Sequence, residues 1–367
     1  MIIGCPKEIK IQEYRAGLTP ANVKMYIEAR HKVLIESNLG FAIGFSDGEY
    51  ERAGASIVSK EDLFKQSDMI IKVKEPLESE YKYFRENQIL YTYLHLAADR
   101  NLVNMLLEKK ILGIAYETIK VNNALPCLAP MSAIAGRLSV LESAKYIQKT
   151  FGGEGVLLSG VPGVAKSNIV IIGAGVVGLN AAQIAIGIGA NVTILDIDMQ
   201  RLEYVDHIFD MKINTLYSSR ANLLSSIENA DVVIGAVLIP GAKAPKLIKR
   251  DDLKLMKKGS IIIDVAIDQG GCFETSKPTT HNNPIFEVDS VLHYCVANMP
   301  GAVAKTSTLA LTDSTLNYGL SIAKDVKEAI KSNSAIFEGV NTIDGKCVYK
   351  AVSDAFDIPY TPLKNII

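Results

Sequence analysis

The sequence predicts an α/β protein built from two doubly wound, mostly parallel sheets. Three observations support this fold class. Strand and helix patterns alternate through residues 1–125, a glycine-rich turn joins a strand to a helix at 169–178, and two further apolar strand patterns follow at 231–236 and 260–265. A length of 367 residues favours two domains or more.

The first 125 residues contain short apolar runs separated by helix-length segments. Strands are expected at residues 2–4, 32–36, 69–73, 89–94 and 111–116. Helices are expected at residues 20–30, 61–66 and 99–109, the last opened by Asp99 as its cap. This alternation indicates a parallel sheet.

A long helix is expected to begin with Ser132 as its N-cap and to run to about residue 149. Its apolar face is predicted to contain Ile134, Leu138 and Leu141. A second long helical stretch is expected over residues 307–332, after which the chain is predicted to end in short irregular pieces.

The segment 169–196 reads as a strand, a GxGxxG turn, a helix and a second strand that ends in Asp196. Gly173 permits the tight turn, Gly175 lets the backbone approach a pyrophosphate, and Gly178 lets the helix pack on its strand. The helix that starts at Val176 offers free N–H groups and a positive dipole end to phosphates. Asp196 would bind both ribose hydroxyls and repel a 2′-phosphate. The segment therefore predicts a Rossmann-like domain that binds NAD rather than NADP.

Composition excludes several classes of partner. The net charge of −1 gives no basic field for nucleic acid or an anionic membrane, and 48% apolar with 22% charged residues is typical of soluble globular proteins. Residues 167–195 contain no charge, but Asn180, Gln183, Asn191 and several glycines argue against a membrane span. The N-terminus has no signal-peptide pattern, so a cytoplasmic protein is expected.

Cysteine usage predicts neither disulfides nor a metal site. The five cysteines are scattered without a CxxC pair, which favours buried thiols in a reducing compartment. They are Cys5, Cys127, Cys272, Cys295 and Cys347.

Four polar residues follow predicted strands: Arg15, Lys74, His95 and Asp268. Ligands of open α/β sheets bind beyond the carboxyl ends of the strands, so these groups would suit one small anionic molecule. Arginine suits a bidentate carboxylate contact, and histidine suits acid–base work near neutral pH. Each residue also has an ordinary structural interpretation: a surface arginine, a lysine paired with a nearby glutamate, a core histidine and a turn aspartate.

Taken together, the motifs of this chain are similar to those of the alanine dehydrogenase and pyridine nucleotide transhydrogenase family, over nearly the whole length. The segments that carry the resemblance are GCPKEI at 4–9, EYR at 13–15, KVKEP at 72–76, YLHLAAD at 93–99, MSAIAGRL at 131–138, GVPGV at 160–164, LIPGAKAP at 238–245, VAIDQGG at 265–271 and NMPGAV at 298–303. The blocks around His95 and Asp268 discriminate best.

The resemblance implies an alanine dehydrogenase, which converts L-alanine reversibly to pyruvate and ammonia by hydride transfer from Cα to NAD and hydrolysis of the imine. Arg15 and Lys74 would bind the substrate carboxylate and carbonyl. His95 would be the acid–base catalyst and Asp268 its catalytic partner. Residues implied around NAD, besides the glycines, are Ser132, Val176, Asp196, Arg201, Ser218, Val237, Leu238, Val265, Ala266, Ile267, Lys277, Val296, Ala297, Asn298 and Met299.

The resemblance also implies a domain organisation. Residues 130–305 would form the NAD-binding Rossmann domain, inserted into a discontinuous substrate and catalytic domain of residues 1–129 plus 306–367, with the active site in the cleft between them. The family is commonly hexameric, so a homo-oligomer is expected. Three departures from the family pattern, at Lys277, at Ala304 with Lys305 and in the loop 151–159, concern the cofactor rim.

Two other functions remain open from the sequence. One is the soluble NAD(H)-binding subunit of a pyridine nucleotide transhydrogenase, which shares the family resemblance. The other is a catalytically silent NAD-binding or assembly protein. Lys74, His95 and Asp268 together favour the dehydrogenase over both.

Overall fold

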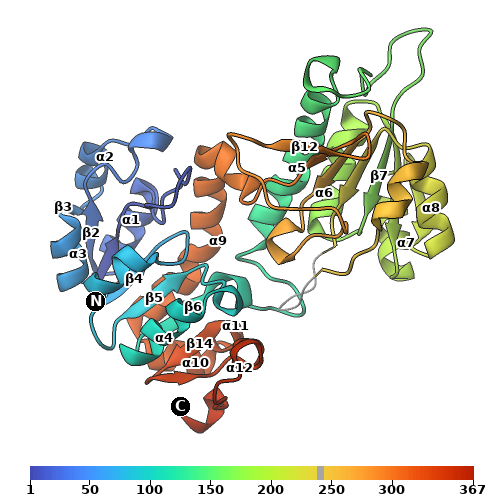
Figure 1. Cartoon of the computed structure of the whole chain (residues 1–367). Helices are drawn as coiled ribbons and strands as arrows, with labels where there is room; N and C mark the ends of the chain where they lie inside the picture. Colours follow the sequence, from blue (N-terminus) through green and yellow to red (C-terminus); the bar gives the residue numbers. More distant parts are fainter. Residues whose placement is uncertain (238–243) are drawn as a thin grey trace. The chain divides into compact units, whose positions relative to one another are not determined.

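A computed structural model describes residues 1–237 and 244–367 of the chain. The chain forms two compact units, which are described separately: Met1–Met131 with Val303–Ile367, and Ser132–Ala302. Figure 1 shows the strands near the N-terminus (blue) and the C-terminal helices (red) in the same unit, so the chain leaves the first unit and returns to it.

The first unit is built on a sheet with strand order β15-β14-β6-β5-β4-β1-β2-β3. Strands β1 to β6 pair in parallel, whereas β14 and β15 are antiparallel additions at one edge. The strands are β1 (Ile2–Cys5), β2 (Lys32–Glu36), β3 (Ser56–Val58), β4 (Met69–Ile71), β5 (Ile89–Thr92), β6 (Leu112–Ala115), β14 (Val340–Ile343) and β15 (Lys346–Cys347).

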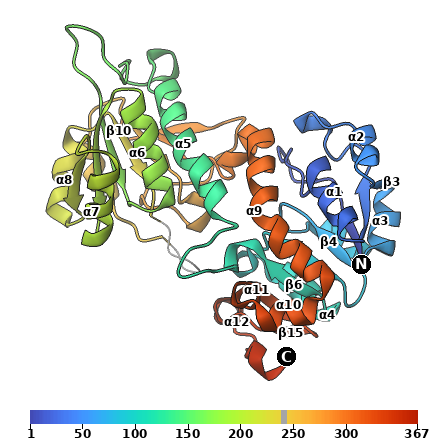
Figure 2. The same cartoon turned by 180° about the vertical axis from the view of Figure 1, so that it is seen from behind.

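The helices of the first unit begin at side-chain caps. Helix α1 starts with Pro20 behind Thr19, whose hydroxyl accepts from the Asn22 N–H, and α4 starts behind Asp99, as the sequence predicts. Figure 2 shows α9 beside α1, with which it makes contact. The helices are α1 (Pro20–Glu28), α2 (Asp47–Arg52), α3 (Lys60–Gln66), α4 (Arg100–Glu108), α9 (Ala304–Lys324), α10 (Val326–Ser332), α11 (Ser334–Gly339) and α12 (Lys350–Phe356).

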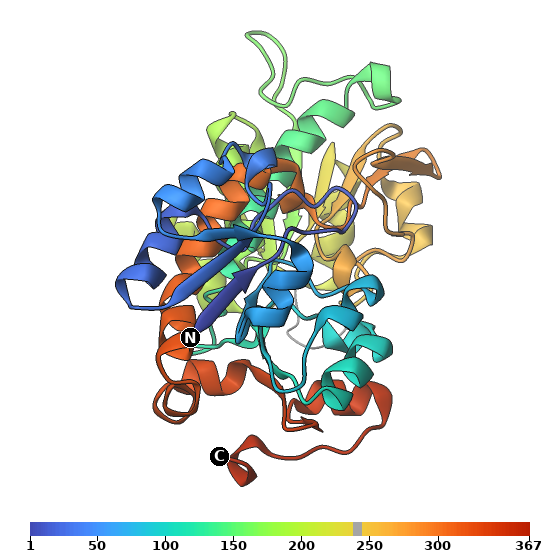
Figure 3. The same cartoon turned by 90° about the vertical axis from the view of Figure 1, so that its left-hand side faces the viewer.

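The prediction of an irregular C-terminal end is wrong. The chain after Ser332 forms α11, β14, β15 and α12, and Figure 3 shows this segment (red) from a second side. Thr342 fixes β14 to β6, because its hydroxyl donates to the Ile111 carbonyl at 2.9 Å and accepts from the Gly113 N–H at 3.2 Å. The predicted helix 307–332 is two helices, because Asp325 is extended and its carboxylate caps α10.

The second unit is a doubly wound sheet with strand order β12-β13-β11-β10-β7-β8-β9, parallel except for β12. The chain runs outward from β7 to β9, then crosses back to β10 on the other side of β7. Its strands are β7 (Asn168–Ile172), β8 (Asn191–Asp196), β9 (Asn214–Tyr217), β10 (Val232–Gly235), β11 (Ile261–Asp264), β12 (Ile285–Val288) and β13 (Val291–Tyr294). Its helices are α6 (Val176–Gly187), α7 (Met199–Ile208) and α8 (Arg220–Glu228).

Helix α5 (Ala129–Tyr146) corrects the predicted N-cap at Ser132. The helix begins three residues earlier, because Pro130 fits the first turn, where a backbone N–H has no helical partner. Gly136 packs α5 on α6, since a Cβ there would lie 2.2 Å from the Val177 carbonyl oxygen. Of the predicted apolar face, Leu141 is 53% exposed.

Each unit has its own apolar core. In the first, α3 and α4 cover one face of the sheet around Leu63, Leu90 and Leu106, and in the second the central strands bury Val170, Val233 and Ile262. Within the described residues, no helix is both long and apolar enough to cross a membrane.

Candidate active site

Arg15 lies in the loop after β1 and is 3% exposed. Its Nε donates to Glu13 Oε1 at 2.8 Å and its Nη2 donates to Glu13 Oε2 at 2.6 Å, which is a two-pronged ion pair. Burial lowers the pKa of the guanidinium, but Glu13 outweighs burial and raises it overall. Glu13 therefore balances the buried charge and fixes the plane of the guanidinium group.

Lys74 follows β4 and is also buried. Its backbone N–H donates to Glu8 Oε1 at 3.2 Å, and the Val73 N–H donates to the same oxygen at 2.7 Å. The other oxygen of Glu8 pairs with Lys72, whose Nζ lies 3.1 Å from Glu8 and 3.0 Å from Glu80. This buried triad supports the backbone on which Lys74 stands.

His95 follows β5 and has a left-handed backbone, with φ 47° and ψ 36°. This conformation costs a residue with a Cβ roughly 1–2 kcal/mol. Glu117 Oε1 accepts from the His95 N–H at 2.7 Å and from the Leu94 N–H at 3.1 Å. The Tyr93 ring stacks on the imidazole at 5.9 Å, and the side chain of His95 is exposed. The backbone is fixed while the imidazole faces outward.

Glu75 interacts electrostatically with both Lys74 and His95. Burial raises its pKa, but Lys74, His95 and Lys10 outweigh burial and lower it overall. Lys10 Nζ lies 2.5 Å from Glu75 Oε1, whereas no hydrogen-bond partner for Oε2 exists among the described residues. Tyr93, stacked on His95, interacts with Arg15. The first unit thus brings Arg15, Lys74 and His95 to one end of its parallel strands.

The glycine turn of the second unit follows β7, at the point where the strand order reverses. Gly173 has φ 105°, which favours glycine, and a Cβ on Gly178 would lie 1.9 Å from the Gly173 carbonyl oxygen. A Cβ on Gly175 would meet no atom within 4 Å. Gly175 is also the N-cap of α6 and has no side chain to cap it. This open backbone at a helix N-terminus suits a pyrophosphate.

Asp196 ends β8 beside this turn. Its Oδ2 accepts from the Ala174 N–H at 2.6 Å, and its Oδ1 accepts from the Asp198 N–H at 2.9 Å. Arg201 Nε donates to the Ala174 carbonyl at 2.6 Å. A carboxylate has further lone pairs, so Asp196 retains acceptor capacity for ribose hydroxyls.

The other residues predicted to bind the cofactor follow the carboxyl ends of neighbouring strands. Ser218 follows β9, Val237 follows β10, residues 265–267 follow β11, and residues 296–299 follow β13. Parallel strands share one carboxyl edge, so these residues gather there with the glycine turn. Leu238 lies outside the described residues.

Two further members of the predicted set do not directly follow a strand. Ser132 is in the first turn of α5, and Lys277 holds its ammonium 4.5 Å from the centre of the Phe286 ring.

Asp268 is exposed in the short 3-10 turn Ile267–Gln269 after β11. The buried carboxylate of Asp264 organises this loop. It accepts from the Ala266 N–H at 3.1 Å, the Cys272 N–H at 2.9 Å and the Ser276 hydroxyl at 2.6 Å. Lys246 closes the loop on the other side, where its ammonium donates to the Gly271 carbonyl at 3.0 Å.

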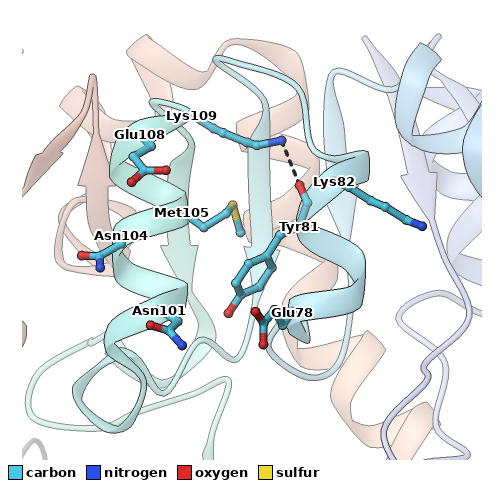
Figure 4. A pocket seen from close by; sticks show the side chains of 8 residues that line it. All are labelled: Glu78, Tyr81, Lys82, Asn101, Asn104, Met105, Glu108 and Lys109. Atoms are coloured by element: carbon cyan, nitrogen blue, oxygen red, sulfur yellow. Dashed lines mark hydrogen bonds between the residues drawn. The ribbon is translucent and has the colours of Figure 1, made fainter.

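An open surface pocket of about 300 Å³ lies in the first unit between α4 and the 3-10 helix Glu78–Tyr83. Figure 4 shows Tyr81, Glu78 and Asn101 pointing to one end of it. It is lined by Glu78, Tyr81, Lys82, Asn101, Asn104, Met105, Glu108 and Lys109. None of the predicted substrate or cofactor residues lines this pocket, so it is separate from the groups described above.

The sequence reasoning missed the acids that hold the predicted residues. Glu13 stands two positions before Arg15, a spacing that signals a local pair. Glu8 and Glu117 offer no such signal, because they reach the backbone of Lys74 and His95 from neighbouring strands of the folded sheet.

A doubly wound parallel sheet with a glycine turn at its switch point defines the class as a nucleotide-binding α/β protein. Residues 4–135 match the family model "Alanine dehydrogenase/PNT, N-terminal domain", and residues 139–350 match "Alanine dehydrogenase/PNT, C-terminal domain". The chain belongs to the alanine dehydrogenase/PNT family.

Named relatives are similar over the whole chain. An alanine dehydrogenase of Methanococcus maripaludis is 53% identical, with 100% of both chains covered, and one of Staphylococcus haemolyticus is 50% identical, with 100% of this chain and 99% of the other covered. A solved L-alanine dehydrogenase has a TM-score of 0.94 at 47% identity, covering 97% of this chain and 99% of the other. A transhydrogenase from Sinorhizobium meliloti, at 23% identity and a TM-score of 0.82 (96% and 100% covered), shares the fold.

Proposed function

We propose that this protein is an NAD-dependent alanine dehydrogenase, which converts L-alanine and water reversibly to pyruvate and ammonia. The observation that carries the proposal is the set of Arg15, Lys74 and His95 at one strand edge. It occurs in a chain about half identical, over its full length, to curated alanine dehydrogenases.

The second unit fits NAD by its chemistry. Gly175 leaves room for a pyrophosphate at the N-terminus of α6, and the charge of Asp196 disfavours a 2′-phosphate. The wider cofactor set would be Ser132, Val176, Arg201, Ser218, Val237, Leu238, Lys277, residues 265–267 and residues 296–299. Bound NAD would supply the hydride acceptor.

The polar groups of the chain have separate roles in this proposal. Arg15 and Lys74 would hold the substrate carboxylate and carbonyl, and His95 would move protons at the amine and the hydroxyl. Asp268 would stabilise the cationic imine of the substrate. Positioning and charge are the contributions that the protein itself makes to such a reaction. In this proposal, residues 1–129 with 306–367 would form the domain that binds the substrate, and residues 130–305 would form the domain that binds NAD.

Initial rates at the NADH absorbance band test this function. L-alanine should be the best of a panel of small amino acids, and NAD should be preferred to NADP. Without an amino acid, hydride transfer from NADPH to NAD, followed by separating the two nucleotides, would favour the transhydrogenase-like alternative. Complete inactivity with intact NAD binding would favour a silent binding protein.

We also propose a cytoplasmic homo-oligomer, with a hexamer favoured by family resemblance. The loop after α5 supports association, since it exposes Leu157 (63%), Val161 (53%) and Val164 (63%). Light scattering on the purified protein measures the assembly. A monomer at micromolar concentration would contradict this proposal.

A further inference from the structure

Glu117 lies in a 3-10 turn, Tyr116–Thr118, that directly follows β6. Strands β5 and β6 pair in parallel, with Thr92 opposite Ala115, so Glu117 stands beside the segment that leaves β5. That segment contains His95. The pairing of these two parallel strands therefore places the carboxylate of Glu117 within hydrogen-bond distance of the backbone of His95.

Both oxygens of Glu117 bind this segment. Oε1 accepts from the Leu94 and His95 N–H groups, and Oε2 lies 3.3 Å from the Leu94 nitrogen. A charged acceptor makes a stronger hydrogen bond than a neutral one. These bonds hold His95 in a left-handed conformation that is uncommon for residues other than glycine.

The turn that carries Glu117 is itself fixed from the C-terminal segment. The Thr118 hydroxyl lies 3.2 Å from the Gly339 carbonyl oxygen, and Asn341 Nδ2 donates to the Thr118 hydroxyl at 2.8 Å. Tyr93, whose ring stacks on the imidazole, is held by a 2.6 Å bond from its hydroxyl to the Cys127 carbonyl. The supports of His95 thus come from three separate parts of the first unit.

We infer that Glu117 is a positioning residue for the reaction: it holds the backbone of His95 so that the imidazole points to the substrate. This inference rests on the proposed function, in which His95 moves protons. Glu117 touches the backbone of His95 rather than the reacting atoms, so its effect on turnover passes through His95. Backbone strain is often found at functional sites, where the surrounding structure must maintain it.

The chain offers a matched control. Asn38 also has a positive φ of 62°, and its N–H donates to Asp47 Oδ1 at 2.8 Å. Asp47 and Glu117 are both half-buried carboxylates that hold an exposed residue by its backbone N–H. Asp47→Ala therefore reproduces the loss of such a carboxylate without touching the segment of His95.

The first test is hydrogen exchange by mass spectrometry, which needs no activity. In Glu117→Ala, the peptide containing Leu94 and His95 should lose protection by about tenfold or more, whereas Asp47→Ala should leave it unchanged. Glu117→Gln, which keeps one acceptor oxygen, should lie between. Unchanged exchange in both Glu117 variants would overturn the inference. If Glu117→Ala does not fold, Glu117→Gln carries the test.

The second test is a double-mutant cycle on turnover. Glu117→Ala should lower kcat about 10²-fold, as expected for a displaced catalytic group, with KM for NAD unchanged within about twofold. In a His95→Ala background the same substitution should have no further effect on kcat. An equal loss in both backgrounds would mean a general structural role and would overturn the inference. A wild type inactive with alanine would refute the proposed function instead, while the exchange data would still report on Glu117.

Discussion

Asp196 is the residue on which cofactor choice depends. Replacing it with asparagine keeps an acceptor for the Ala174 N–H but removes the charge that repels a 2′-phosphate. Asp196→Asn should therefore raise the ratio of kcat/KM for NADP to that for NAD by about tenfold or more. This is the size of effect expected when one repulsion between like charges is removed.

Asp198→Asn is the matched control, because Asp198 caps α7 two residues later and lies outside the proposed cofactor set. It should leave the cofactor ratio unchanged. An unchanged ratio in Asp196→Asn as well would argue against ribose recognition by this carboxylate.

Lys72 is a buried charge that stabilises the fold around Lys74 and takes no part in the proposed reaction. Its ammonium is fully buried between Glu8 and Glu80, and these acids outweigh burial and raise its pKa. Lys72→Met should lower the free energy of unfolding by roughly 3–5 kcal/mol, because it leaves two carboxylates buried without their partner.

Urea denaturation measures this change in the free energy of unfolding. Lys254→Met, which breaks an exposed pair with Asp251, should leave the unfolding midpoint nearly unchanged. Equal midpoints for Lys72→Met and the wild type would show that the triad does not stabilise the fold.

At the scale of elements, the packing of α6 on β7 decides the shape of the glycine turn. A Cβ on Gly178 would lie 1.9 Å from the Gly173 carbonyl oxygen, so Gly178→Ala must push the helix away. We expect a loss of roughly 1–3 kcal/mol of stability and at least tenfold weaker NAD binding.

Calorimetric titration with NAD and thermal unfolding measure both effects. Gly187→Ala in the same helix is the control. A Cβ added at Gly187 would meet no atom within 4 Å, and alanine favours the helical conformation. Gly178→Ala with wild-type affinity for NAD would contradict the role given to this close packing.

Elements with local signals were predictable from the sequence, and elements that depend on distant partners were not. The GxGxxG turn and the cap at Asp99 are encoded within a few residues. Strand β14 depends on β6, with which it pairs across the chain, so its own short apolar pattern gave no signal. Glu117 could not be predicted either, because its hydrogen bond to His95 forms only when β5 and β6 pair.

At the scale of the whole molecule, stability should depend on pH through buried histidine. Burial lowers the pKa of His293, whose ring is held between the Thr275 hydroxyl at 2.7 Å and the Val291 carbonyl at 3.0 Å. The folded state therefore favours neutral imidazole. Its contribution to stability is full above the unfolded pKa of about 6.5 and is lost as the pH falls below that value.

The free energy of unfolding of wild type and His293→Gln, compared from pH 8 to pH 5, tests this dependence. The variant should be less stable at pH 8, and the difference should shrink as the pH falls, because only the wild type loses stability through this imidazole. A difference that stays constant with pH would contradict the assignment.

The proposed reaction depends on His95, at the carboxyl end of β5 in the first unit. The most direct measurement is NADH formation from L-alanine by wild type and by purified, folded His95→Ala, with substrate and NAD saturating. We predict clear turnover by the wild type and a loss of roughly 10²–10⁴-fold in kcat in the variant, the range for a general acid–base group. Near-wild-type turnover in His95→Ala would show that His95 is not the acid–base group of this reaction.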